Sequence, residues 1–172
     1  MRPLLSVDWR VEPLQKRHGR EAFSCGQVAL DRYLQYQARQ DAQSQVAAVF
    51  VAVKPPDSTG LGFYSLSASR IDAADLPPDL AKKLPRYPYV PVTLLGRLAI
   101  DQPYQGQGLG QFLLLDALYR SLQAAATIAA MAVVVDAKDA AAAAFYERYG
   151  FMPLSASQGR MFLAMKTVAV LF

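Results

Sequence analysis

Three glycines within five residues constrain this chain most. Gly106 and Gly108 lie between an apolar stretch that ends at Ile100 and a long amphipathic run that begins at Leu109, and Gly110 is the second residue of that run. A loop with few side chains lets backbone N–H groups approach an anion closely, and the first turn of a following helix adds unpaired donors and the positive end of its dipole. The pattern predicts a strand, a phosphate-binding loop and a helix, with a diphosphate as the natural ligand.

Two well-known phosphate loops do not fit these residues. A Walker loop ends in Gly-Lys-Ser/Thr, whereas Leu109 and Gly110 follow Gly108. A dinucleotide fingerprint is Gly-x-Gly-x-x-Gly with an acidic residue about 20 positions further on, whereas these glycines alternate and Asp136 lies too far along the chain. A third pattern, Gln-x-x-Gly-x-Gly, is matched by Gln105, Gly108 and Gly110.

Strands and helices alternate around this loop. Hydrophobic periodicity predicts helices over Gln27–Gln40, Asp75–Leu84, Leu109–Ala125 and Ala140–Tyr149, with Ser24 near the N-cap of the first. Turn residues between two β-rich runs predict a hairpin of Val46–Val53 with Gly62–Ser69. Further strands are predicted over Val92–Ile100, Met131–Asp136 and Arg160–Val168 and near Phe151. Such an order is typical of a mixed α/β sheet with helical crossovers. At 172 residues we expect a single domain, 1–172.

Composition excludes several classes of protein. Cys25 and His18 are each the single residue of their kind, so neither a disulfide within the chain nor a zinc or other His/Cys metal site is expected. We expect His18 to be a packed or surface polar residue and Trp9 to lie in the core. The longest apolar run, Ala124–Val135, is shorter than the roughly 20 residues that span a bilayer. With no signal-peptide pattern at the N-terminus, we expect a cytoplasmic protein without a membrane segment.

Positive charge is concentrated in the first part of the chain. Residues 1–97 carry 13 Lys/Arg against 9 Asp/Glu, and residues 98–172 carry five of each. The segment Leu80–Ile100 has four basic residues and no carboxylate, interleaved with Tyr87, Tyr89 and prolines. Such a segment suits a polyanion such as a nucleic acid. A solvated loop whose prolines fix an extended path is the alternative interpretation.

The loop and its flanks together resemble the GNAT family of acetyl-CoA-dependent N-acetyltransferases. The resemblance covers the strand before the loop, the loop itself, the strand AVVVDA and the segment AFYERYGF (144–151). It implies a central, twisted, mostly antiparallel sheet that splays at the acetyl-CoA site and is flanked by helices. By resemblance, the acetyl-CoA contacts are the pantetheine and thioester residues Leu98, Ala99 and Ile100, the pyrophosphate residues Gln105, Gly106, Gln107, Gly108, Leu109 and Gly110, and Asp139, where many members have Asn.

The same resemblance implies a catalytic tyrosine, Tyr146, which matches the residue that faces the CoA sulfur in this family. A phenol with a pKa near 10 is too weak an acid to protonate a thiolate outright, so we expect a hydrogen bond to the developing thiolate charge. No Glu or His occupies a motif position that marks a general base. An α-amino group, with a pKa near 8, needs less help from a base than a lysine, with a pKa near 10.4.

A narrower resemblance covers nearly the whole chain and points to the toxin branch of the family. Its members acetylate the α-amino group of aminoacyl-tRNA, block translation and are neutralised by a ribbon-helix-helix antitoxin; by resemblance we also expect a homodimer. The expected tRNA contacts are Arg39, Lys82, Lys83, Arg86 and Arg97, of which Arg97 could equally anchor its strand. Two alternatives stay open: a GNAT acetyltransferase that acts on a small amine, a peptide N-terminus or a protein lysine, and a silent acyl-CoA-binding module.

Overall fold

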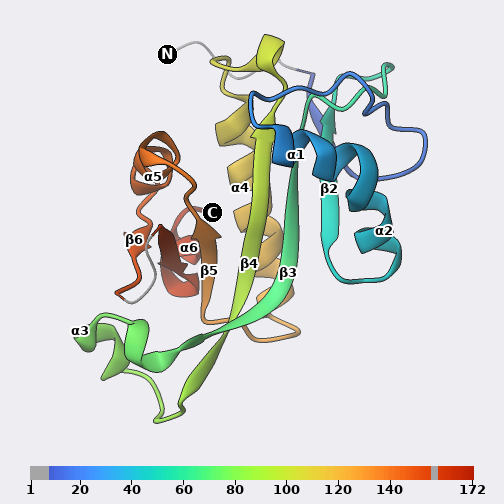
Figure 1. Ribbon diagram of the computed structural model, residues 1–172. Coiled ribbons are helices and arrows are strands. Elements are labelled where there is room, and N and C mark those ends of the chain that lie inside the picture. Colours follow the sequence, from blue (N-terminus) through green and yellow to red (C-terminus); the bar gives the residue numbers. More distant parts are fainter. Residues whose placement is uncertain (1–7, 156–158) are drawn as a thin grey trace. The chain divides into compact units, whose positions relative to one another are not determined.

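A computed structural model describes residues 8–155 and 159–172 (Figure 1). Its seven-stranded sheet has the order β1-β2-β3-β4-β5-β7-β6. The pairing is antiparallel for β1/β2, β5/β7 and β6/β7 and parallel for β4/β5, so the predicted mixed, mostly antiparallel α/β sheet is confirmed. The strands are β1 (Arg10–Pro13), β2 (Ala48–Val53), β3 (Gly62–Asp72), β4 (Tyr89–Ile100), β5 (Ala132–Asp136), β6 (Met152–Pro153) and β7 (Arg160–Ala164).

Six α-helices lie in the described part of the chain. They are α1 (Val28–Arg32), α2 (Ala38–Gln43), α3 (Pro78–Ala81), α4 (Leu109–Ala125), α5 (Ala140–Glu147) and α6 (Met165–Val170). Short 3₁₀ turns precede α3 at Ala73–Asp75 and α4 at Gln102–Tyr104. The chain divides into two compact units: the first consists of Met1–Ser65 with Arg97–Asp116, and the second of Leu66–Gly96 with Ala117–Phe172.

The first unit has its own apolar core beneath the N-terminal helices. Figure 1 shows α1 and α2 following one another, with α2 beside β2. Leu34, Val51 and Phe63 are fully buried there, and the ring of Phe63 stacks on that of Tyr33 at 6.1 Å between centroids. This core holds the N-terminal helices against the strands of the unit.

The expected helix over Gln27–Gln40 is interrupted, and its N-cap is misplaced. Gln27, rather than Ser24, precedes the first turn, and a π-helical turn at Tyr33–Gln37 separates α1 from α2. Ser24 instead donates its backbone N–H to Asp101 Oδ1 at 2.9 Å. Leu34 and Ala38 are both fully buried, and Tyr33 is buried next to them.

The second unit is built on β5, whose four apolar residues Ala132–Val135 are buried. Such a continuous apolar run is typical of a strand covered on both faces. Residues Thr93–Leu95 of β4 pair with Val133–Val135, and β4 continues beyond them to Ile100. On its other side β5 pairs with β7 along its whole length.

Two predicted elements of this unit are wrong in extent. The strand expected over Arg160–Val168 ends at Ala164, and α6 follows from Met165. Met165 and Val168 are both buried, and their spacing of three suits a helix better than a strand. The helix expected over Asp75–Leu84 shrinks to the single turn α3, with Pro78 at its first position.

The expectation of one domain stays a prediction, although β3, β4 and α4 each contribute residues to both units. None of the helices in residues 8–155 and 159–172 is long and apolar enough to cross a membrane.

Candidate active site

The loop before α4 has the backbone conformation that its glycines predict. Gly106 and Gly108 have φ angles of +77° and +88°, in the left-handed region that L-residues with a side chain rarely adopt. A Cβ atom built at either glycine meets no heavy atom within 4 Å. Glycine is therefore required at both positions by the backbone conformation, and the face of the loop is open to a ligand.

The buried leucines at the start of helix α4 fix the end of this loop in place. Leu109 at the start of the helix is 1% exposed, and Leu113 and Leu114 in the next turn are fully buried. The N–H groups of residues 106–108 have no backbone acceptor within the described ranges. Together with the open first turn of a 17-residue helix they form a cradle of donors for an anion.

The end of β4 lies close to the start of β3 in the same unit. A Cβ atom on Gly62 would come within 2.9 Å of both Ile100 Cδ1 and Leu113 Cδ1 and 3.1 Å of the Ala99 carbonyl oxygen. Ala99 is buried, whereas Leu98 and Ile100 are half-buried. The three residues predicted to contact pantetheine and the thioester thus lie directly before the loop.

The two glutamine side chains of the loop are engaged with the backbone. Gln105 donates from Nε2 to the carbonyl oxygens of Ile100 at 2.8 Å and Cys25 at 2.9 Å. Gln107 donates to the carbonyl oxygen of Pro103 at 3.1 Å. A carboxamide nitrogen carries two hydrogens, so Gln105 has no side-chain donor left for a phosphate. The backbone N–H of Gln105 is engaged as well, with the carbonyl oxygen of Gln102 at 3.2 Å.

Tyr146, in the second unit, is a buried phenol beside a carboxylate. It lies on α5 and is 7% exposed, with Phe145 and Phe151 each at 5.3 Å between ring centroids. Burial, and next the negative charge of Asp136, raise the pKa of Tyr146 to about 12. In the part of the chain that the structure describes, no group hydrogen-bonds its hydroxyl. The hydroxyl stays protonated at ordinary pH and is available as a donor.

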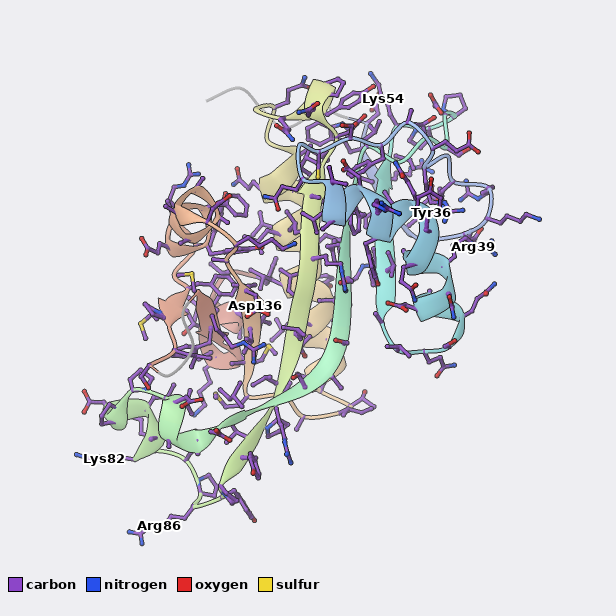
Figure 2. The ribbon with its side chains drawn as sticks, in the orientation of Figure 1. Tyr36, Arg39, Lys54, Lys82, Arg86 and Asp136 are labelled. Atoms are coloured by element: carbon purple, nitrogen blue, oxygen red, sulfur yellow. The ribbon has the colours of Figure 1, made fainter. Side chains whose placement is uncertain are left out.

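Asp136 was not identified from the sequence as part of this environment. It follows the buried residues of β5, is exposed, and receives two hydrogen bonds from the guanidinium of Arg160 (Figure 2). The acidic end of an apolar strand was visible in the sequence, but nothing there related it to Tyr146.

Asp139, predicted to contact CoA, has a structural role in the same unit. It is the N-cap of α5, and its Oδ1 accepts the backbone N–H of Ala142 at 2.8 Å. Asn and Asp are about equally good N-caps. This role accounts for an Asp at the position where the family resemblance leads us to expect Asn, and the contact of Asp139 with CoA remains a prediction.

The predicted tRNA contacts divide between the two units. In the second unit Lys82, Lys83 and Arg86 are exposed, and Figure 2 shows Lys82 and Arg86 extending away from α3 and the loop that follows it. Tyr87 is 66% exposed next to them. Arg70, which the sequence analysis did not single out, places its guanidinium 3.9 Å from the ring centroid of Tyr89.

In the first unit Arg97 is anchored. Its guanidinium lies 3.6 Å from the ring centroid of Tyr33, whose hydroxyl donates to Asp41 Oδ2 at 2.8 Å. Burial, and next the hydrogen bond with Asp41, raise the pKa of Tyr33 to about 12. This geometry is that of the strand anchor, the alternative role that the sequence left open.

Arg39 lies on α2, one turn after the exposed Tyr36 (Figure 2). Burial, and next the positive charge of Arg39, lower the pKa of Arg20. Arg20 therefore belongs to the same basic cluster, which sequence spacing did not reveal because the two residues lie on different segments.

The remaining candidates from the sequence are His18 and Trp9. No group of three or more His, Cys, Asp or Glu that could hold a metal ion occurs among the described residues. His18 is 2% exposed and its Nδ1 accepts the backbone N–H of Gln15 at 2.9 Å, which confirms the packed polar role. Trp9, expected in the core, is half-buried against Phe112.

Comparison with known proteins finds a matching family and relatives that are similar along most of the chain. Residues 45–153 match the model of the acetyltransferase (GNAT) domain. A probable toxin TacT of Sinorhizobium fredii is 32% identical over 92% of both chains. A tRNA-acetylating toxin of Mycobacterium tuberculosis is 36% identical over 87% of this chain and 88% of its own length.

Solved structures agree with these relatives. A structure of AtaT complexed with acetyl-methionyl-tRNAfMet is 29% identical, with a TM-score of 0.89 over 96% of this chain and 99% of the other. A variant of AtaT with one tyrosine replaced by phenylalanine, bound to the C-terminus of the antitoxin AtaR and to acetyl-CoA, has a TM-score of 0.82, 25% identity, and coverage of 96% and 98%.

The stacking of Arg97 on Tyr33 yields a prediction about stability. We expect Arg97→Ala to lower the free energy of unfolding by about 1–2 kcal/mol, because it removes a cation–π contact on a buried ring. Arg39→Ala, the control, should change it by less than about 0.5 kcal/mol. Urea denaturation of the two variants measures the difference. Equal stability of both variants would contradict the anchoring role.

Proposed function

This chain belongs to the GNAT acetyltransferase family, and from that premise we propose that it is a toxin that uses acetyl-CoA to acetylate the α-amino group of aminoacyl-tRNA. Blocked aminoacyl-tRNA cannot support translation, and a cognate antitoxin would neutralise the protein. The observation that carries this proposal is the similarity of nearly the whole chain to AtaT, which was solved in complex with acetyl-methionyl-tRNAfMet. A tRNA-acetylating toxin that is 36% identical to this chain supports the same proposal.

The first unit supplies groups that fit the donor substrate. Gly106 and Gly108, in the left-handed region, leave the loop open on the side where a Cβ atom would lie. The N–H groups of residues 106–108 have no backbone acceptor within the described ranges. Such a cradle suits the diphosphate of acetyl-CoA. Leu98, Ala99 and Ile100, directly before it, are proposed to bind the pantetheine arm and the thioester oxygen through their backbone groups, as an oxyanion hole does.

Transfer is direct in this proposal. The neutral amine attacks the thioester carbonyl, a C–N bond forms, the C–S bond breaks, and CoA leaves as a thiolate. Tyr146 donates its hydroxyl proton in a hydrogen bond to the sulfur as negative charge develops there, and the excess proton of the amine passes to water. A phenol whose pKa is about 12 is a weak acid that stays protonated, so it can hold a hydrogen bond to the sulfur without giving up its proton.

The acceptor carries a polyanion, and two basic surfaces suit it. Lys82, Lys83 and Arg86 are exposed on the second unit beside Tyr87, and Arg39 lies near Arg20 on the first. Cations of this kind bind phosphates without reading sequence. We propose these residues as tRNA contacts. Arg97 was expected among them, and we propose that it also anchors its strand through Tyr33.

The finer features of the partners are part of the same proposal. Structures of relatives include a variant of AtaT bound to the C-terminus of the antitoxin AtaR, and a KacTA–DNA complex. We propose a ribbon-helix-helix antitoxin, a homodimer and a place in the bacterial cytoplasm for this chain, and a single domain over residues 1–172.

The activity is tested by transfer of labelled acetyl from acetyl-CoA to charged and to deacylated tRNA. We expect label on charged tRNA alone and a loss of about tenfold or more in Tyr146→Phe, because one donor to the leaving group is removed. Tyr149→Phe, the same change on a half-buried neighbour, serves as the control. Label on neither tRNA pool, from protein that binds acetyl-CoA, would favour a small amine, a peptide N-terminus or a protein lysine as acceptor.

The raised pKa of Tyr146 predicts how kcat/KM behaves at high pH. The amine reacts in its neutral form, so kcat/KM should rise with pH up to about 8, the ordinary pKa of an α-amino group. Tyr146 acts in its protonated form, which a raised pKa preserves until about 12. Initial rates should therefore reach a plateau and not fall before about pH 10. A falling limb between pH 8 and 10 that Tyr146→Phe abolishes would contradict this assignment.

A further inference from the structure

A small pocket in the first unit lies beside the end of β4. It has a volume of about 210 Å³ and is lined by two segments far apart in the sequence, the chain around the start of α1 and the chain from the end of β4 to the loop: Cys25, Gln27, Leu30, Leu98, Ala99, Ile100 and Gln105. Leu98–Ile100 are the residues proposed to hold the thioester. Whatever fills this pocket is therefore close to the acetyl group.

The two walls of the pocket are tied together by hydrogen bonds. Gln105 donates from one nitrogen to Ile100 O and to Cys25 O. Next to it the backbone N–H of Ser24 donates to Asp101 Oδ1, and that of Gln102 donates to the Ser24 carbonyl oxygen, each at 2.9 Å. Three of these hydrogen bonds hold the segment before α1 to the segment after β4, and one of the three comes from Gln105. The bond from Gln105 to Ile100 O fixes the Gln105 side chain against the end of β4.

The lining has a definite chemical preference. None of its seven residues is charged, and Leu30 and Ala99 are buried. A charged group placed there would lose water without gaining a partner, which is costly. The volume is below the range of roughly 300–1,000 Å³ that is typical of pockets for whole small-molecule ligands. One uncharged side chain is a better fit than a nucleotide base with its sugar.

We propose that this pocket receives the side chain of the acceptor amino acid, that it favours uncharged side chains, and that Gln105 is a positioning residue that sets its width. The inference rests on the proposed function, since it assumes an aminoacyl acceptor. The Gln105 side chain is then not one of the diphosphate contacts that the resemblance led us to expect, because both of its amide hydrogens are already donated to backbone carbonyls.

The test replaces Gln105 by methionine, which has a similar length and no donor. Gln35→Met is the matched control: Gln35 also donates to two backbone carbonyls of the N-terminal segment, those of Phe23 at 3.0 Å and Glu21 at 3.4 Å, but it does not line the pocket. Both variants lose two hydrogen bonds of the same kind. A merely structural effect would appear in both.

The first readout is the ratio of kcat/KM values for tRNAs that carry aliphatic side chains of different size or a charged side chain. We expect wild type to favour one uncharged class, and Gln105→Met to reduce that preference by about tenfold, the scale on which pocket contacts discriminate side chains. The KM for acetyl-CoA should change by less than about twofold, because no donor to the diphosphate is lost. A raised KM for acetyl-CoA with unchanged acceptor preference would overturn the proposal.

The second readout needs no substrate. Cys25 is the single cysteine and lines the pocket, and burial, followed by its interaction with Asp31, raises the pKa of its thiol to about 11. Alkylation by iodoacetamide should be slow in wild type and about tenfold faster in Gln105→Met, because a loosened wall exposes the thiol. Gln35→Met should react as wild type does.

The two readouts separate failure of the inference from failure of the proposed function. Faster alkylation in Gln105→Met, combined with no acetylation of any aminoacyl-tRNA by wild type, would overturn the aminoacyl acceptor and the proposed function while supporting the positioning role. Acetylation of aminoacyl-tRNA by wild type, with unchanged alkylation and unchanged acceptor preference in Gln105→Met, would overturn the inference alone.

Discussion

The left-handed backbone at Gly106 and Gly108 is the constraint on which the donor site depends. It turns the chain from the end of β4 into α4 without placing a side chain over the first turn of the helix. Burial of Leu109 and the leucines of the next turn fixes that turn in place. An anion cradle of backbone donors therefore follows from a conformational requirement at two residues together with apolar packing beneath them, and no charged side chain is needed to form it.

The two units supply different kinds of chemistry. The first supplies backbone donors and a small uncharged pocket tied together by Gln105. The second supplies Tyr146, whose burial and proximity to Asp136 raise its pKa and keep it protonated. No Glu or His occupies a motif position that marks a general base. An acceptor that is partly neutral near pH 8 agrees with that arrangement, which is one reason why an α-amine suits this protein better than a lysine side chain.

Local patterns in the sequence predicted the loop, β5 and the polar, non-catalytic role of His18 well, because each depends on short-range periodicity, glycine spacing or the absence of a motif around a single residue. They failed where long-range contacts decide. The stacking of Arg97 on Tyr33 joins two segments far apart in the sequence. The π-turn at Tyr33–Gln37 and the change from strand to helix at Met165 interrupt stretches whose periodicity was interpreted as one continuous element. The hydrogen bond from Gln105 to the Cys25 carbonyl oxygen joins residues 80 positions apart, and no sequence motif predicts it.

Recognition of the diphosphate by the backbone of the loop is the central claim, and it is tested most directly by titration calorimetry with acetyl-CoA and with acetyl-pantetheine, which lacks the diphosphate. Wild type should bind acetyl-CoA more tightly by a factor of about 100 or more, and the pair Gly106→Ala and Gly108→Ala should remove most of that difference while leaving acetyl-pantetheine binding within about twofold. An equal preference for acetyl-CoA in wild type and in the double variant would contradict the account.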